Sequence, residues 1–334
     1  MRAFHISVSD DVLSTAVTNV TPIATDPSDV LVRVEFSGVN YKDAMVVDPR
    51  LRVRRSPQLV GGVDAAGEIV ESSDPALPVG AQVAVHGGDL GVARDGGFAE
   101  YVYAPSRYVS RLPEALSARA AMIVGTAGLS AMRSVLALED HGLSEDHGLS
   151  NGEVLVTGAT GGVGSMAVAL LAARGYRVAA STGSSGAIGW LEGLGASRVI
   201  GREEIADKPD RVLASERWAG AVDCVGGDTL AQILRSLRYG AAVAASGLVA
   251  GADLVTTVYP FITRAVALLG VDVVEMDAPA RARTWQAVAD LTSRLDFDSL
   301  VDREVPLEGV AEALEVIRRG ATRGRILVRP TPGG

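Results

Sequence analysis

Hydrophobic and polar residues alternate along the first third of the chain, a pattern typical of half-buried β-strands. The alternation is most regular from Val30 to Phe36 and continues at Gly67–Glu71 and Gln82–His86, between prolines and glycines. Shorter strands are predicted at Phe98–Val102 and Tyr108–Arg111. This part of the chain is therefore predicted to form a β-rich domain.

The pattern changes at Ser117–Val135, where apolar residues take up helical spacing. From residue 153 onward, short apolar runs alternate with helix-length segments, which predicts a parallel sheet buried on both faces with right-handed crossovers. The predicted strands are 153–157, 177–181, 198–200, 218–223, 241–246 and 266–273, with helices at 165–173 and 186–194.

The end of the chain returns to the first domain. A helix is predicted at Ala280–Leu295, then a polar loop, a helix at Leu307–Arg319 and a final strand at Arg325–Val328. The expected fold class is therefore α/β, with a doubly wound parallel sheet and a β-rich domain. The β-rich domain is predicted to comprise residues 1–123 and 273–334, and the domain with the parallel sheet residues 124–272.

Composition narrows the class of protein. The chain has 334 residues, 48% of them hydrophobic, and a net charge of −9, which argues against sequence-independent nucleic-acid binding. A single cysteine, Cys224, excludes an internal disulfide and a Cys-x-x-Cys zinc site. The longest fully apolar run, 166–173, is far shorter than the roughly 18 residues of a membrane helix. With no signal peptide evident, we expect a cytoplasmic protein without a membrane or nucleic-acid partner.

The hexapeptide EDHGLS occurs twice in succession, at 139–144 and 145–150. Two copies are too few for a repeat architecture. The duplicated histidines, His141 and His147, raise the question of a metal site. No third ligand accompanies them in a ligand-type spacing, so a solvated loop is the favoured interpretation.

A glycine-rich segment, VLVTGATGGVG at 154–164, joins the first predicted parallel strand to a helix. Compared with G-x-G-x-x-G, the three glycine positions fall on Ala159, Gly161 and Gly164. Gly161 would let a pyrophosphate approach the backbone, and Gly164 would let the helix pack close to the strand. The helix N-terminus favours an anion. The segment predicts dinucleotide binding, and a glycine-rich packing turn is the alternative.

The residues after the second parallel strand favour NADPH over NADH. An NAD site has an acidic residue there, about 20 residues after the glycine loop, for the ribose 2′-hydroxyl. This chain instead has Ser181-Thr182-Gly183-Ser184-Ser185, whose hydroxyls can donate to a 2′-phosphate. Arg202, after the third strand, would add a positive charge.

These features together resemble the medium-chain dehydrogenase/reductase superfamily. Its zinc alcohol dehydrogenases carry Cys near Asn40 and His-Glu near Val63-Asp64, and this chain has neither. It therefore looks like the zinc-free quinone oxidoreductase branch, with no metal, and within it is similar to the acrylyl-CoA reductase (AcuI/YhdH-type) subfamily. Besides the glycine loop, the segments that carry this resemblance are GVNYKDA at 38–44, GTAG at 125–128, LGAS at 194–197, WAGA at 218–221, TTVYPFI at 256–262 and GVD at 270–272.

The resemblance implies a GroES-like catalytic domain and a Rossmann NADP-binding domain. It also implies NADPH-dependent reduction of an activated carbon–carbon double bond, with acrylyl-CoA reduced to propionyl-CoA by hydride transfer to the β-carbon. A quinone or free-enone oxidoreductase and a non-catalytic NADPH-binding protein are the alternatives. The superfamily further implies a homodimer in which strand 266–273 pairs across a two-fold axis.

The same resemblance implies the site residues. Tyr41 would donate a hydrogen bond or a proton, or only pack against the cofactor. Asn40 would orient the substrate carbonyl, or only hold a turn. The implied cofactor-binding residues are Tyr41, Thr126, Gly161, Gly162, Val163, Gly164, Thr182, Gly183, Ser184, Arg202, Leu248 and Ile262.

A run of arginines follows the NYKDA segment, and coenzyme A carries phosphates that guanidinium groups bind well. Arg52, Arg54 and Arg55 are therefore candidate substrate residues, with Arg50 in the same run, and a solvated loop is the alternative. The chain departs from the subfamily at Ser184, where arginine is usual, and in loop 86–97, which lacks a tryptophan.

Overall fold

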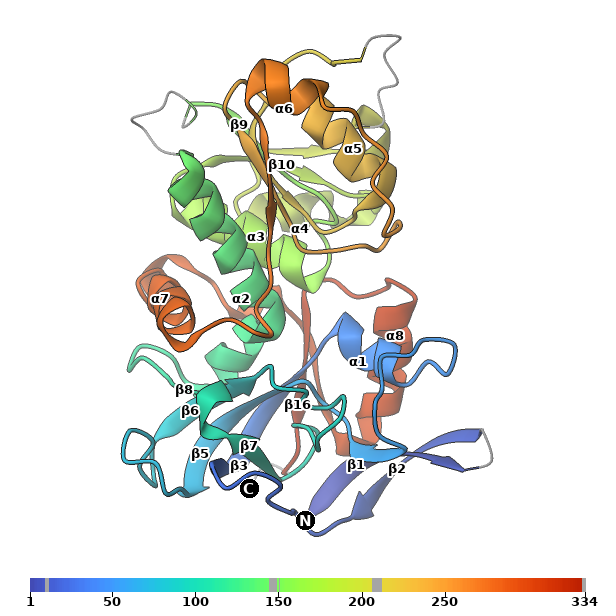
Figure 1. Ribbon diagram of the computed structural model, residues 1–334, viewed down its shortest axis with the longest axis vertical. Coiled ribbons are helices and arrows are strands. Elements are labelled where there is room, and N and C mark those ends of the chain that lie inside the picture. Colours follow the sequence, from blue (N-terminus) through green and yellow to red (C-terminus); the bar gives the residue numbers. More distant parts are fainter. Residues whose placement is uncertain (10–11, 144–148, 150, 206–211, 332–334) are drawn as a thin grey trace. The chain divides into compact units, whose positions relative to one another are not determined.

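The structure is a computed structural model, and it describes residues 1–9, 12–143, 149, 151–205 and 212–331. The chain folds into two compact units (Figure 1). Unit 1 comprises Met1–Ala127, Val273–Thr292 and Phe297–Gly334. Unit 2 comprises Gly128–Asp272 and Ser293–Asp296.

Unit 1 is built on two β-sheets. The larger is ordered β15-β16-β3-β5-β6-β8, with β7 also paired to β3, and the smaller is ordered β2-β1-β4. The strands are β1 Arg2–Ser9, β2 Val12–Asn19, β3 Asp29–Val39, β4 Gln58–Val60, β5 Asp64–Glu71, β6 Gln82–His86, β7 Tyr101–Pro105, β8 Val109–Arg111, β15 Val301–Pro306 and β16 Arg325–Arg329. The helices of this unit are α1 Tyr41–Val46, α7 Ala278–Ala289 and α8 Val310–Arg318, and α1 packs against α8.

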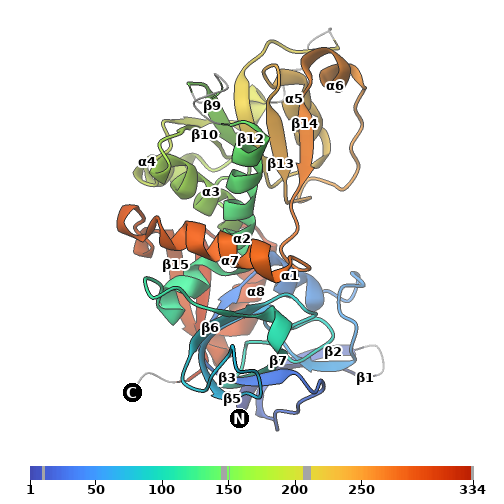
Figure 2. The ribbon, with the colours of Figure 1, turned by 60° about the vertical axis from the view of Figure 1, so that its left-hand side comes forward.

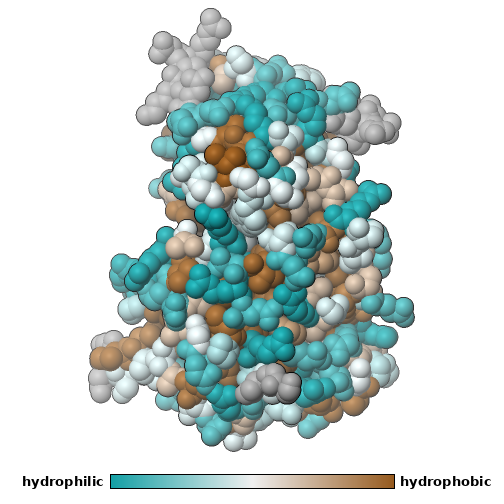
Figure 3. Space-filling model, turned by 180° about the vertical axis from the view of Figure 1, so that it is seen from behind, coloured by the Kyte–Doolittle hydropathy of each residue, from teal (hydrophilic) through white to brown (hydrophobic). Residues whose placement is uncertain are grey.

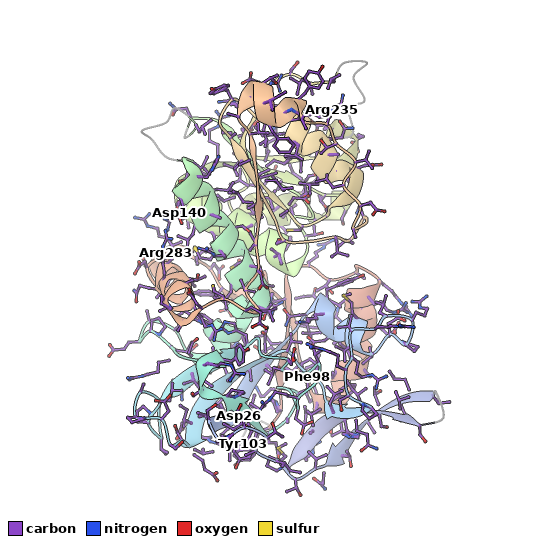
Figure 4. The ribbon with its side chains drawn as sticks, in the orientation of Figure 1. Asp26, Phe98, Tyr103, Asp140, Arg235 and Arg283 are labelled. Atoms are coloured by element: carbon purple, nitrogen blue, oxygen red, sulfur yellow. The ribbon has the colours of Figure 1, made fainter. Side chains whose placement is uncertain are left out.

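Several elements of unit 1 differ from the sequence prediction. β7 begins at Tyr101 because Phe98 leaves the alternation and packs into the core (Figure 4), where its ring meets Phe4 edge-to-face at 6.2 Å. β15 occupies a stretch predicted as polar loop, because an edge strand with charged side chains lacks the apolar alternation that marks buried strands. The helix predicted at Ala280–Leu295 ends at Ala289.

Unit 2 contains a six-stranded parallel sheet ordered β11-β10-β9-β12-β13-β14, with β14 at one edge (Figure 2). The strands are β9 Glu153–Val156, β10 Arg177–Ser181, β11 Arg198–Ile200, β12 Trp218–Asp223, β13 Ala242–Ala245 and β14 Ala267–Gly270. The helices are α3 Gly162–Ala173, α4 Ile188–Gly193, α5 Gly227–Ser236 and α6 Tyr259–Arg264. The strand order reverses direction between β9 and β12, as in a Rossmann fold, and the predicted fold class is confirmed.

α2, Ala118–His141, begins in unit 1 and continues into unit 2. Its length and composition would suffice to cross a membrane, but 78% of its apolar window is buried inside the protein. It is therefore a core helix.

On the face drawn in Figure 3, hydrophobic side chains form small groups among hydrophilic ones. Of the two duplicated histidines, His141 is the last residue of α2, and His147 lies outside the described residues.

Candidate active site

A cluster of polar side chains lies in the interior of unit 1. Asn40 follows β3, Asp64 opens β5 and Arg325 opens β16. The Asn40 amide donates to the Asp64 carboxylate at 2.8 Å and to the Gly38 carbonyl at 3.1 Å. Arg325 donates to the Asn40 side-chain oxygen at 3.1 Å, and its Nη2 lies 3.7 Å from Asp64 Oδ2. Asn40, Asp64 and Arg325 are all buried, so this cluster is shielded from water.

The kink inside α2, at Gly125, completes the cluster at Asp64. The backbone N–H of Thr126 donates to Asp64 Oδ2 at 2.9 Å, and its hydroxyl donates to Oδ1. Gly125 has a φ of 50°, and a Cβ there would lie 2.6 Å from Asp64 Oδ2 and 2.7 Å from Arg325 Nη2. Only glycine permits this close approach of backbone to carboxylate, which explains the kink in α2.

Asp43 is a second buried carboxylate in this region. It accepts the backbone N–H of Asn40 at 2.7 Å and that of Val63 at 2.9 Å. Burial raises the pKa of Asp43 to about 7, and the neighbouring Asp64 carboxylate adds to the rise while the two N–H donors oppose it. Burial also lowers the pKa of Arg325, against the opposing effect of the two carboxylates. The cluster thus contains two carboxyl groups and only one guanidinium group.

Tyr41 and Asn40 are adjacent but have different surroundings. Tyr41 is the first residue of α1 and is 47% exposed, and its hydroxyl has no hydrogen-bond partner among the described residues. Asn40 is buried, and both of its amide hydrogens are already donated within unit 1. The geometry leaves the Tyr41 hydroxyl available to a bound molecule and favours a turn-holding role for Asn40.

Three glycines of the unit 2 glycine loop, Gly158, Gly161 and Gly164, have different structural reasons. Gly158, with a φ of 58°, makes the tight turn one residue before Ala159. A Cβ on Gly164 would lie 2.8 Å from the Ala159 Cα and would also meet the Gly158 carbonyl. Beside Gly161 the space is open, because a Cβ there would lie no closer than 3.4 Å to the Gly158 carbonyl oxygen. Within the described residues no side chain caps α3, so its first N–H groups can bind a phosphate.

The ends of β9 and β12 are joined where the strand order reverses. The Thr157 hydroxyl donates to the Asp223 carboxylate at 2.6 Å, and the Gly226 N–H donates to the other oxygen at 2.8 Å. Burial raises the pKa of Asp223. Burial also raises the pKa of the Cys224 thiol to about 12, so Cys224 is not a reactive thiolate. Asp223 was not among the residues predicted from the sequence, although an acidic residue at the end of a buried strand could have indicated it.

Arg202 lies against the turn that follows β10. A Cβ on Gly183 would lie 2.6 Å from the Arg202 guanidinium carbon. Thr182 accepts the backbone N–H of Ser184 at 3.0 Å, which shapes this turn. Arg202 is exposed and has no ion-pair partner in the described part of the chain. The apolar side chains of Leu248 and Ile262, also in unit 2, are 59% and 72% exposed.

Two family models match the chain. "Alcohol dehydrogenase GroES-like domain" matches residues 26–114, and "Zinc-binding dehydrogenase" matches residues 162–294. The side chains present do not fit a zinc ion, because no group of three His, Cys, Asp or Glu among the described residues could hold a metal. The positions expected to ligate zinc carry Asn40, Val63 and Asp64, and Asp64 is occupied by internal hydrogen bonds.

Known relatives cover nearly the whole chain. The putative quinone oxidoreductase YhfP of Bacillus subtilis is 44% identical over 93% of this chain and 94% of its own, and its structure with NAD bound has a TM-score of 0.93. The acrylyl-CoA reductase AcuI of Ruegeria pomeroyi is 43% identical over 90% of this chain and 89% of its own. The yhdH oxidoreductase of Salmonella enterica, solved in complex with NADP, is 39% identical over 99% of this chain and 100% of its own, with a TM-score of 0.91. The chain therefore belongs to the medium-chain dehydrogenase/reductase family, close to the acrylyl-CoA reductases and the YhdH/YhfP quinone oxidoreductase-like proteins.

Proposed function

We propose that the chain reduces a carbon–carbon double bond conjugated to a thioester, with NADPH as cofactor, acrylyl-CoA as substrate and propionyl-CoA as product. The observation that carries this proposal is the 43% identity to the acrylyl-CoA reductase AcuI over 90% of the chain. The available Tyr41 hydroxyl supports it, because such a reduction requires a polar donor and no metal ion.

The side chains and backbone of unit 2 fit a phosphorylated dinucleotide. The open face of Gly161 and the first N–H groups of α3 would hold the pyrophosphate. Arg202 would pair with the 2′-phosphate, since a guanidinium binds phosphate oxygens through charge-assisted hydrogen bonds. Leu248 and Ile262 would lose their exposed apolar surface against the cofactor. The remaining residues of the proposed set are Gly162, Val163, Gly164, Thr182, Gly183 and Ser184 of unit 2, together with Tyr41 and Thr126 of unit 1.

When bound, NADPH supplies the hydride that the substrate β-carbon accepts. Negative charge then develops on the thioester oxygen, and a donor placed there lowers the barrier. We assign this role to the Tyr41 hydroxyl, which either donates a hydrogen bond to that oxygen while water gives the α-carbon its proton, or itself gives this proton to the α-carbon and is reprotonated by water. Asn40, held by Asp64 and Arg325, positions the first turn of α1, which carries Tyr41.

The test compares NADPH oxidation with acrylyl-CoA, crotonyl-CoA, a simple quinone and methyl vinyl ketone, followed by NADPH absorbance. We expect turnover to be fastest with acrylyl-CoA. Tyr41→Phe is expected to lower kcat about 100-fold without changing the NADPH dissociation constant, as for loss of a general acid. If Tyr41 only packs against the cofactor, Tyr41→Phe will match the wild type and Tyr41→Ala will weaken NADPH binding instead.

A quinone or free-enone reductase is the second candidate, favoured by the 44% identity to the putative quinone oxidoreductase YhfP. Turnover with the quinone or the ketone but with neither thioester would select this function. YhfP has been solved with NAD bound, so the ratio of kcat/KM for NADPH and NADH should be measured as well. Arg202→Ala is expected to lower that ratio about tenfold or more, because it removes a charge-assisted phosphate contact. NADPH binding without turnover would indicate a non-catalytic protein.

We also propose that the protein is a cytoplasmic homodimer. β14 is an edge strand of the unit 2 sheet, and an unpaired edge can form backbone hydrogen bonds with a second copy. Leu268 on this strand is 39% exposed and would be covered in the dimer. Light scattering should give twice the chain mass for the wild type and a lower mass for Leu268→Arg, and a monomeric wild type would rule the dimer out.

A further inference from the structure

The surface of unit 1 beside α1 carries an excess of positive charge. α1 packs against α8, and Arg318 in the last turn of α8 lies close enough to Asp48 and Arg50, after α1, to interact with both electrostatically. Six charged residues of the loop after α1 and of the C-terminal half of α8 are here named the rim patch: Arg50, Arg52, Arg318, Arg319, Asp48 and Glu315. Four guanidinium groups against two carboxylates leave a net charge of +2, on a chain whose net charge is −9. The rim patch is therefore a local site of attraction for anions.

Not all guanidinium N–H donors of the rim patch are used in ion pairs. Arg50 is paired with Asp48, while Arg318 and Arg319 share Glu315 at 2.7 Å and 3.5 Å. Arg52 is exposed and has no partner among the residues that the structure describes. Five N–H donors of Arg52 are thus open to solvent, and an incoming phosphate could accept two of them at once.

The other two arginines of the run serve the fold. Arg54 donates to the Ser56 carbonyl at 2.9 Å, and its Nε is buried. Arg55 forms an ion pair with Asp89, and its backbone N–H donates to the Val92 carbonyl at 2.9 Å. These contacts anchor the loop after α1, so Arg52 is the member of the run that is available to a ligand.

We propose that the rim patch binds the phosphorylated nucleotide end of coenzyme A, with Arg52 as the central donor and the arginines of α8 beside it. The proposal rests on the proposed function, because it takes an acyl-CoA as the substrate. Tyr41 stands at one end of α1 and the patch follows the other end. A six-residue helix is about 9 Å long, a distance that the extended pantetheine arm can span.

The test compares acrylyl-CoA with acrylyl-N-acetylcysteamine, a thioester that lacks the nucleotide. Arg52→Ala is expected to raise KM for acrylyl-CoA about tenfold with little change in kcat, as for loss of one charge-assisted phosphate contact. Arg52→Ala combined with Arg318→Ala should raise KM further. Neither change should alter KM for the short thioester. The control is Arg33→Ala, which removes an exposed, Glu68-paired charge of the same unit on β3.

Calorimetry provides a readout besides turnover. With NADPH saturating, so that the dinucleotide site is filled, coenzyme A should bind the wild type more tightly than Arg52→Ala, and added salt should reduce this difference. Adenosine 3′,5′-bisphosphate should compete with acrylyl-CoA far better than inorganic phosphate does.

An unchanged KM for acrylyl-CoA in Arg52→Ala would overturn the rim-patch proposal while leaving the reductase intact. Equal competition by inorganic phosphate would overturn it as well, because it would indicate a general anion patch. If acrylyl-CoA is not reduced at all, the proposed function fails, and calorimetry still decides whether coenzyme A binds through Arg52. Absence of any coenzyme A binding would reject the rim-patch proposal, whereas the proposed function is decided by turnover of acrylyl-CoA.

Discussion

Replacing Arg325 with methionine tests whether the buried cluster of unit 1 is held by charge. Methionine fills a comparable volume, so the main change is the loss of the guanidinium. The substitution leaves the buried carboxylate of Asp64 without its cation. It also removes donors to the Ile123 carbonyl at 3.1 Å, the Val39 carbonyl at 3.2 Å and the Asn40 side chain at 3.1 Å.

The expected cost can be estimated from these contacts. Each lost hydrogen bond contributes a net stabilisation of about 1 kcal/mol. Stranding one partner of a buried ion pair costs about 3–5 kcal/mol, which includes the hydrogen bonds to the removed partner. We therefore expect the free energy of unfolding of unit 1 to fall by about 4 kcal/mol for Arg325→Met. At about 2–4 °C per kcal/mol for a domain of this size, Tm should fall by roughly 10 °C.

The assay is a double-mutant cycle with Asp64→Asn, measured by urea unfolding. Asp64→Asn removes the stranded charge, so the double variant should be more stable than Arg325→Met alone by about 1–3 kcal/mol. Purely additive effects would show that Arg325 acts through packing and not through its charge. A loss below about 1 kcal/mol for Arg325→Met would refute the estimate itself.

Asp43, the glycine loop and the expected independence from metal each give a further prediction. The pKa of Asp43 is raised to about 7 in the folded protein, so the unfolded chain loses this proton at a lower pH than the folded protein does. The free energy of unfolding should therefore fall as pH rises from about 4 to about 7. Asp43→Asn should flatten this pH dependence when unfolding by urea is measured at each pH. Gly164→Ala should destabilise the protein by about 1–3 kcal/mol, because the added Cβ meets the backbone of Gly158 and Ala159. Gly161→Ala should change unfolding by less than about 0.5 kcal/mol yet weaken NADPH binding in a fluorescence titration. Dialysis against a chelator should leave activity unchanged, and activity restored by added zinc would contradict this expectation.

Much of unit 2 could be predicted from the sequence alone. The central strands of its sheet, β9, β10, β12 and β13, are largely buried on both faces, so each appears as a short apolar run between helix-length segments. The glycine loop could also be located, because its conformation depends on local backbone freedom at Gly158 and close approach at Gly164. In both cases the signal lies within a few consecutive residues.

The polar cluster of unit 1 depended on the tertiary structure. Arg325 was predicted only as the start of a strand, and nothing near it in the sequence indicates a partner; the antiparallel pairing of β16 with β3 brings it to Asn40 and Asp64. Asn40 could not be assigned from its neighbours, because its role depends on which donors and acceptors distant segments supply. Local patterns report which face of an element is buried, whereas the partner of a buried charge is decided by the pairing of segments far apart in the chain.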